Sequence, residues 1–151
     1  MLDHTDLKIL RVLQRDGRIP WVDLAERVAL SPSACQRRVQ ALMQRGIVSG
    51  IGARIDPRAL GFEVQAFVSV RVDRQDVSRA QKFRTLIAQC PEVLACHMLT
   101  GEVDYLLQIV ARDLPSFGRF IEEQILSMPG VKDASSSIVL DQVTINAPLL
   151  G

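Results

Sequence analysis

Residues 31–46 place hydrogen-bonding side chains where they could contact a nucleic acid. Drawn as a helix at about 100° per residue, the stretch puts five polar residues on one arc: Ser33, Gln36, Arg37, Gln40 and Gln44. These side chains donate and accept hydrogen bonds, and none is a carboxylate that would repel phosphate. The arc is therefore suited to reading base edges in the major groove of DNA. Taken alone, the same pattern also fits a solvated helix surface.

The rest of this stretch has the features of a helix that packs onto a small domain. Ser31 can cap the first free N–H groups, Pro32 suits the first helical position, and Gly46 is a typical helix stop. The opposite arc is apolar and carries Cys35, Val39, Leu42 and Met43. We therefore predict a helix with a buried arc and an outward polar arc, flanked by Arg38 and Arg45.

Two further helices are predicted ahead of this one. Leu7, Leu10 and Leu13 recur at helical intervals in a first helix of about four turns. A second helix has Trp21, Leu24, Ala25 and Val28 on one face, with Trp21 expected in the core or at the helix start. Three helices in 46 residues form a helix-turn-helix unit. We expect base contacts from Ser33, Gln36, Arg37 and Gln40, and phosphate contacts from Ser31, Arg38 and Arg45.

Positive charge is concentrated in the same part of the chain. Residues 1–61 hold ten Lys or Arg and six Asp or Glu, whereas residues 62–151 hold eight and eleven. Within residues 31–60, five arginines accompany the single acidic residue Asp56. Because DNA binding needs a basic patch rather than a basic protein, the overall charge of +1 is compatible with it.

A linker separates this unit from a second domain. Ile51, Ala53 and Ile55 alternate with polar or glycine residues, which predicts one short strand. The glycines around it, and Asp56 followed by Pro57, mark the best domain boundary in the chain. We therefore divide the chain into a DNA-binding domain at 1–50, a linker strand and hinge at 51–61, and a second domain at 62–151.

The second domain shows the pattern strand, helix, strand, strand, helix, strand. Apolar residues alternate over 64–72, and a helix follows with Phe83, Leu86, Ile87 and Cys90 inward. Strands over 93–99 and 105–111 flank a turn, and a helix over about 114–128 precedes a last strand over about 131–145. This order predicts an α+β, ferredoxin-like βαββαβ fold with both helices on one sheet face. We expect the other face to be apolar at Phe67, Tyr105, Leu107 and Ile109, and to be covered by a second copy of the chain.

Several classes of protein are disfavoured by composition. No run of about 18 apolar residues occurs, and the N-terminus does not resemble a secretory signal, so we expect a cytoplasmic protein. Cys35, Cys90 and Cys96 include no CxxC pair, which disfavours a disulfide framework or a zinc site and predicts reduced, mostly buried thiols. Cys96 and His97 point to opposite faces of a strand, so they are a poor ligand pair. We expect no metal and no cofactor.

Three segments together resemble the Lrp/AsnC, or feast/famine, family of transcription regulators. They read LDHTDLKIL, VDLAERVALSPSACQRRVQAL and LTGEVDYLLQI, in the family's order and separation. The resemblance covers about residues 2–149 and implies a helix-turn-helix domain, a connecting strand and a ligand-sensing domain. It also implies dimers that assemble further to tetramers or octamers, and amino acids as the usual effectors, bound between dimers.

The resemblance also implies the effector-binding residues. Gly101, Asp104 and Tyr105 match the family's hairpin motif, and Ser135, Ser136 and Ser137 lie in the matching strand. An amino acid needs a carboxylate partner for its ammonium group, and N–H or O–H donors for its carboxylate. Asp104 and the backbone of Thr100, Gly101, Glu102 and Val103 could supply these, although ordinary turn chemistry is the alternative. Many relatives have proline at Ala34, a difference that should leave the helix intact. Many also have an acidic residue followed by an aromatic one at Glu102 and Val103, and because this difference alters the pocket rim, leucine cannot be carried over as the effector.

These observations favour a sequence-specific DNA-binding regulator of amino-acid metabolism or transport. Two recognition helices of a dimer would lie about one DNA turn apart on a roughly palindromic site, and a small effector would change assembly and DNA binding. An architectural DNA-binding protein without effector is one alternative. A sirohaem-decarboxylase-like enzyme is another, disfavoured because His4 and His97 are the only histidines.

Overall fold

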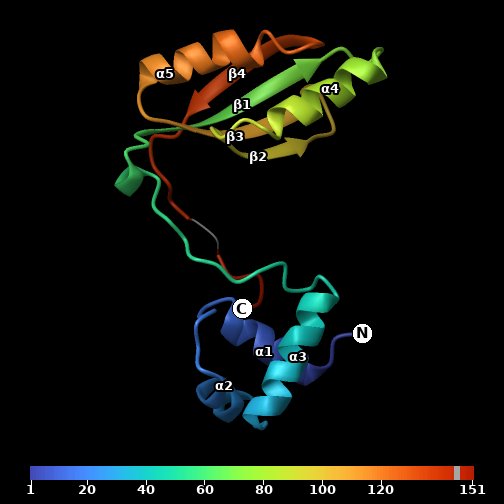
Figure 1. Cartoon of the computed structure of the whole chain (residues 1–151), viewed down its shortest axis with the longest axis vertical. Coiled ribbons are helices and arrows are strands. Elements are labelled where there is room, and N and C mark those ends of the chain that lie inside the picture. Colours follow the sequence, from blue (N-terminus) through green and yellow to red (C-terminus); the bar gives the residue numbers. More distant parts are fainter. Residues whose placement is uncertain (145–146) are drawn as a thin grey trace. The chain divides into compact units, whose positions relative to one another are not determined.

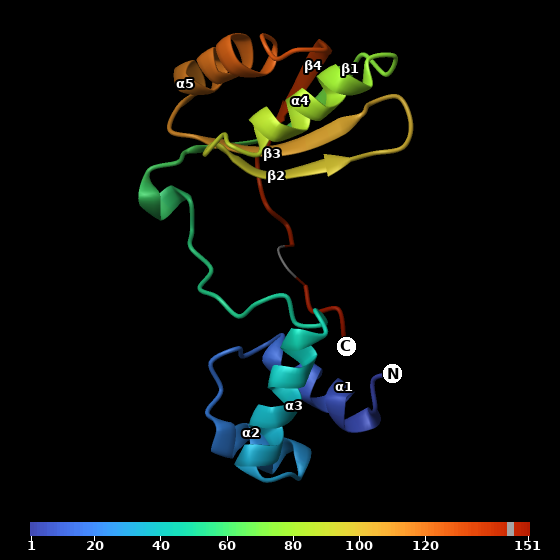
Figure 2. The same cartoon turned by 45° about the vertical axis from the view of Figure 1, so that its right-hand side comes forward.

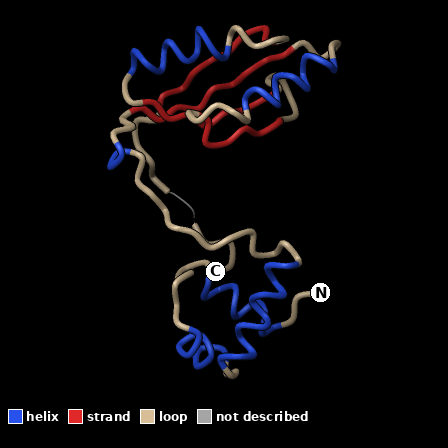
Figure 3. Tube along the Cα trace, in the orientation of Figure 1, coloured by secondary structure: helices blue, strands red, loops and turns tan. Residues whose placement is uncertain are grey.

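The computed structural model describes residues 1–144 and 147–151, and the chain forms two compact units (Figures 1 and 3). The first unit comprises Met1–Arg54 and Val143–Gly151, and the second comprises Ile55–Gln142. None of the helices in the described part of the chain is both long enough and apolar enough to cross a membrane.

Three helices make up most of the first unit: α1 (His4–Leu13), α2 (Trp21–Val28) and α3 (Pro32–Gln44). Helix α3 begins as predicted, because the Ser31 hydroxyl accepts the Ala34 N–H at 3.2 Å. It ends before Gly46, which has a φ of 69°. Helix α1 is shorter than predicted, at ten residues, because the chain turns at Asp16, whose carboxylate accepts the Arg18 N–H.

The core of the first unit joins the inner faces of the three helices. Its fully covered side chains include Ile9, Leu24, Cys35, Val39 and Leu42. One predicted core residue is corrected: Met43 is 41% exposed, because it lies about 100° past Leu42 at the margin of the buried arc. Of the two places expected for Trp21, the structure shows the helix start, where its side chain is 40% exposed.

The second unit is the predicted ferredoxin-like fold. Its elements are β1 (Val64–Val72), α4 (Val77–Ile87), β2 (Val93–Met98), β3 (Tyr105–Ala111), α5 (Leu114–Arg119) and β4 (Val131–Ile138). Helix α5 continues as π-helix over Phe120–Ile125, and a short 3₁₀ turn, Arg58–Leu60, precedes β1. The sheet has the order β2-β3-β1-β4, with antiparallel pairing throughout.

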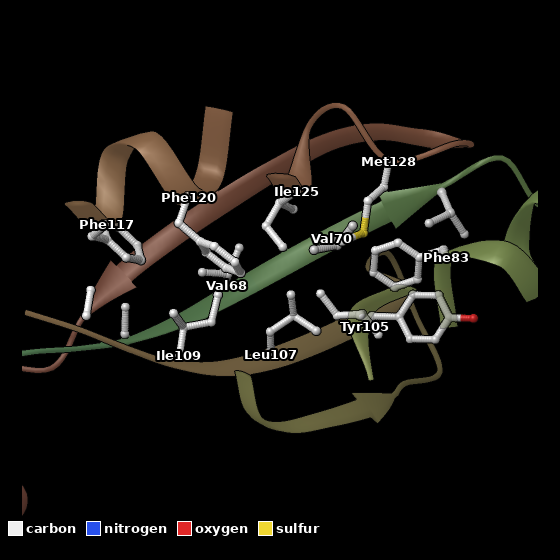
Figure 4. Packing of buried hydrophobic residues seen from close by; sticks show 14 of the residues in the cluster. Val68, Val70, Phe83, Tyr105, Leu107, Ile109, Phe117, Phe120, Ile125 and Met128 are labelled. Atoms are coloured by element: carbon white, nitrogen blue, oxygen red, sulfur yellow. The ribbon is translucent and has the colours of Figure 1, made fainter. Parts of the chain in front are cut away.

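Both helices cover one face of this sheet (Figure 2). Alternate residues of β1 and β3 point toward them, and Figure 4 shows Val68, Leu107 and Phe120 meeting there. Tyr105, Leu107 and Ile109 therefore lie in the core, which corrects the prediction that they line the open face. The reason is register: they pair with Val70, Val68 and Ala66, and paired residues share a face.

The open face carries other residues of β3 than those predicted, among them Val110, which pairs with Gln65. Phe67 lies there and is 40% exposed, while its neighbours on β1 are Gln65 and Ser69. Leu106 of β3 pairs with Ser69 and so faces the same side. The uncovered face thus combines apolar and hydrogen-bonding side chains.

Two predicted strands differ because a strand needs a partner. Residues 51–56 are fully described and form no strand in this single chain, although their alternation is strand-like. Strand β4 ends at Ile138 rather than near 145, a position outside the described residues. Its partner β1 begins at Val64, so after Val139 donates its N–H to Gln65 no further ladder is available.

A substitution at Leu107 tests the corrected face assignment. Leu107 is fully covered in the core, so Leu107→Ala should lower the free energy of unfolding by roughly 2–4 kcal/mol. Leu140→Ala is the matched control, because that side chain is 91% exposed. Urea unfolding of both variants measures the difference, and equal midpoints for the two would contradict the assignment.

Candidate functional site

The outward arc of α3 is an exposed polar surface, as predicted. Ser33, Gln36, Arg37 and Gln40 are all exposed. Among the described residues, Gln36, Arg37 and Gln40 have no side-chain hydrogen bond or ion pair. These three side chains are therefore available to an external partner. They rise from a helix whose buried arc holds it against α1 and α2, so their positions are set by the core.

The start of α3 adds hydrogen-bonding groups to this surface. Ser31 and Ser33 are exposed, and their hydroxyl oxygens lie 3.2 Å apart. The Ser31 oxygen accepts the helix-cap hydrogen bond, and the two hydroxyls share a further hydrogen bond in which either oxygen could be the donor. Such a helix start favours a negative group through its backbone dipoles. At the other end, Arg45 is exposed beside the helix stop.

Arg38 differs from the other predicted contact residues because it is engaged within the domain. Its Nη1 donates to Asp3 Oδ2 at 2.6 Å and to Asp6 Oδ1 at 2.7 Å. The remaining carboxylate oxygens form the capping box of α1, where Asp3 Oδ1 accepts the Asp6 N–H at 2.7 Å. The Asp6 N–H and then Arg38 lower the pKa of Asp3, and Asp3 and then Asp6 raise the pKa of Arg38. Arg38 therefore ties α3 to the start of α1.

A second polar cluster surrounds the hairpin between β2 and β3. Asp104 Oδ2 accepts the Val72 N–H at 2.8 Å, and Oδ1 accepts Arg74 Nε at 2.6 Å. Arg74 Nη2 also donates to the Gly101 carbonyl at 2.7 Å, and Gly101 has a φ of 113°. Asp104 thus joins the hairpin to the end of β1.

The charge state of Asp104 follows from these contacts. Burial opposes ionisation, but the Val72 N–H and Arg74 outweigh it and hold the pKa of Asp104 below its usual 3.8. Because the folded pKa is lowered, this carboxylate stabilises the hairpin above its unfolded pKa. That contribution is lost as the pH falls through the lowered folded value.

Basic residues line a groove beside this hairpin, and sequence reasoning did not single them out. The groove holds about 530 Å³ and includes Arg71, Arg74, Lys132 and Asp133 with Gly101 and Glu102. Arg71 Nε donates to Asp133 at 2.8 Å across the β1–β4 pair. A sequence signal for Arg71 was available: the alternation that identified β1 places Arg71 on the open face with Ser69.

The predicted serines extend along β4 away from the hairpin within one chain. Ser135 pairs with Ser69 and Ser137 with Phe67, so both face the open side, whereas Ser136 pairs with Val68 on the helix side at the sheet edge. The hairpin adjoins Val70 and Val72, near Asp133. Ser137 is four residues farther along β4, or roughly 13 Å. A single chain therefore does not bring the complete predicted effector set together.

The cysteines and histidines do not form a cluster in the described residues. Cys35 is buried and Cys90 partly buried, but Cys96 is exposed at the edge strand, which corrects the expectation of mostly buried thiols. Cys96 pairs with Leu107 and His97 with Leu106, so they lie on opposite faces as predicted. No group of three potential metal ligands occurs within residues 1–144 and 147–151.

Comparison with known proteins finds a family model for each of two parts of the chain. The AsnC-type helix-turn-helix domain model matches residues 2–43, and the Lrp/AsnC ligand binding domain model matches residues 65–149. The Bkd operon transcriptional regulator of Pseudomonas aeruginosa is 36% identical, covering 97% of this chain and 95% of its own. The leucine-responsive regulatory protein of Escherichia coli is 34% identical, over 94% and 87%.

A solved structure gives the same result. A transcriptional regulator from Neisseria meningitidis, solved as a complex with L-Met, is 43% identical with a TM-score of 0.93. The match covers 99% of this chain and 96% of that one. The chain belongs to the Lrp/AsnC family of transcriptional regulators.

Proposed function

We propose that this regulator binds a roughly palindromic DNA site through α3 of two copies, and that an amino acid controls its assembly. The observation that carries the DNA-binding part is the exposed arc of α3, which offers amide and guanidinium groups without a carboxylate. Relatives named for the Bkd operon, proline dehydrogenase and leucine responsiveness support genes of amino-acid metabolism or transport as targets. The Neisseria structure with L-Met supports an amino-acid effector.

We assign each residue a role on DNA from the exposure of its side chain and from the contacts that the side chain already makes within the domain. Gln36, Arg37 and Gln40 read base edges, because they are exposed on one arc and have no side-chain partner among the described residues. Ser33, exposed on the same arc, joins them. Ser31 and Arg45 contact phosphates at the two ends of α3. Arg38 is reassigned from phosphate contact to positioning, because Asp3 and Asp6 already hold its guanidinium.

Base and phosphate contacts have different signatures. Gln36→Ala should relax the sequence preference while leaving nonspecific binding nearly unchanged. Arg45→Ala should weaken binding to all sequences alike and reduce the salt slope of the affinity by about one. Fluorescence anisotropy with specific and random duplexes across a salt series measures both. The division of roles fails if the two variants lose affinity in the same manner.

The positioning role of Arg38 predicts that its acidic partner matters equally. Arg38→Gln and Asp6→Asn should both reduce specific binding, and the double variant should lose no more than either alone. The salt slope should stay near the wild-type value, because no phosphate contact is removed.

Arg45→Gln is the matched control, since it removes the same charge from a residue without such partners among the described residues. If Asp6→Asn strengthens DNA binding while Arg38→Gln lowers the salt slope, Arg38 contacts phosphate instead.

We further propose that the effector site is completed between copies of the chain. The hairpin residues Thr100, Gly101, Glu102, Val103 and Tyr105 form one part, and Ser135, Ser136 and Ser137 of another copy form the other. Support comes from the separation of these groups within one chain, and from the open sheet face that carries Phe67 and Leu106. Asp104 then shapes the hairpin through Val72 and Arg74, rather than serving as a free carboxylate. The assembly is a dimer that associates to a tetramer or octamer.

An amino-acid screen tests this site. An effector at a hundredfold excess over its Kd should raise the Tm by roughly 5–10 °C, because it binds only the folded state. Asp104→Asn should remove most of that shift by releasing the hairpin from Arg74. Asp141→Asn is the control, since Asp141 is an exposed acidic residue after β4. No shift with any of the twenty amino acids would favour the architectural role.

The remaining assignments are proposed on the same basis. The relatives are regulators, so we propose that the chain is not an enzyme, needs no cofactor or metal and acts in the cytoplasm. We also propose 1–50 as the DNA-binding part, 51–61 as the linker and 62–151 as the effector-binding and oligomerising part. Haem-like pigment bound to the purified protein would contradict the non-enzymatic assignment.

A further inference from the structure

The C-terminal tail, residues 147–151, lies in the first unit together with the three helices. The side-chain amide of Gln14 contacts both backbone groups of Leu150. The Leu150 N–H donates to Gln14 Oε1 at 3.0 Å, and Gln14 Nε2 donates to the Leu150 carbonyl. Gln14 caps the end of α1, so this paired contact fixes the tail to a rigid element. A bidentate amide contact of this kind recognises extended backbone as a neighbouring strand does.

The tail also lies beside an apolar groove. A groove of about 360 Å³ is lined by Leu2, Leu10, Leu13, Val48 and Ile51 on one side, and by Leu149 and Leu150 of the tail. The two leucines differ in exposure: Leu150 is half-buried, whereas Leu149 is 98% exposed. Leu150 is therefore the more buried of the two leucines at this groove, and Gln14 binds the backbone of the same residue.

The segment that leads into the tail is anchored at its other end. After β4, the Val139 N–H donates to the Gln65 carbonyl at 2.8 Å, and Gln142 Nε2 donates to Gln65 Oε1 at 2.9 Å. Gln65 belongs to β1 in the second unit. One glutamine thus holds the start of the segment on the sheet, and another holds its end on α1.

We propose that the tail is a docking peptide for the groove beside α1, occupied by the chain's own C-terminus. The chain passes between its units twice, after Arg54 and after Gln142. When the tail is docked, the segment that follows Gln142 is fixed at both ends. This segment then limits the movement of the DNA-binding unit in addition to the segment that follows Arg54. A restrained unit loses less conformational freedom when two recognition helices engage one site, which favours binding to paired half-sites.

The regulatory consequence rests on the proposed DNA-binding function. The tail continues from β4, the strand that carries Ser135, Ser136 and Ser137. A shift of β4 on effector binding would therefore act on the tail without passing through residues 51–61.

Amide exchange and carboxypeptidase trimming of the full-length protein test the docking. In Gln14→Ala and Leu150→Asp, the last turn of α1 should exchange about tenfold faster, and the C-terminus should be trimmed about tenfold faster. Leu149→Asp is the matched control in the same tail, and it should behave like wild type. Exchange at Val39 and Leu42, in the core of the first unit, should be unchanged, which separates undocking from unfolding.

DNA binding provides a second readout. Gln14→Ala should weaken binding to a two-half-site duplex several-fold, yet bind a single half-site as wild type does. If wild-type protein binds no DNA, the proposed function fails while the exchange result still decides the docking. Unchanged exchange and trimming in both variants, or a tail supplied by another copy in a mixing experiment with truncated chain, would overturn the proposal.

Discussion

The pairing of β1 with both β3 and β4 is the constraint on which the second unit depends. Strand β1 is central, so its register fixes which residues of its two neighbours face the helices and which face outward. A slip by one residue would exchange the two faces of the sheet. The same register places the hairpin at the end of β1, where the Val72 N–H meets Asp104, and sets Arg71 opposite Asp133. Core and candidate effector site therefore share one cause.

Much of this fold could be predicted because its signals are local. Alternation over β1 and the cap at Ser31 each depend on neighbouring residues, and the structure confirms both. The prediction that Tyr105, Leu107 and Ile109 line the open face was wrong for a different reason. An alternating strand has two faces, and only pairing with another strand decides which one is buried. Residues 51–56 show the same limit, because their strand-like pattern finds no partner within one chain.

The candidate sites were predictable to the extent that exposure follows from helix periodicity. Gln36, Arg37 and Gln40 are exposed because the buried arc of α3 fixes the opposite side. The ion pairs of Arg38 could not be predicted, because its partners, Asp3 and Asp6, lie more than 30 residues away in sequence. Helix periodicity places a side chain on one flank of its helix, but it cannot show which charged residue of another helix lies beside that flank. Arg74 was missed for the same reason, since its role depends on the distant hairpin.

Polar contacts between segments distant in sequence recur where the chain must hold a functional element in place. Arg38 joins α3 to α1, Arg74 joins the hairpin to β1, and Gln14 joins the tail to α1. In each case a side chain with several donors or acceptors contacts two groups at once, which fixes an orientation as well as a distance. Apolar packing is less directional, so it can form the cores without fixing the orientation of these segments. The cores therefore build the two units, while a few multivalent polar side chains determine how their functional surfaces are presented.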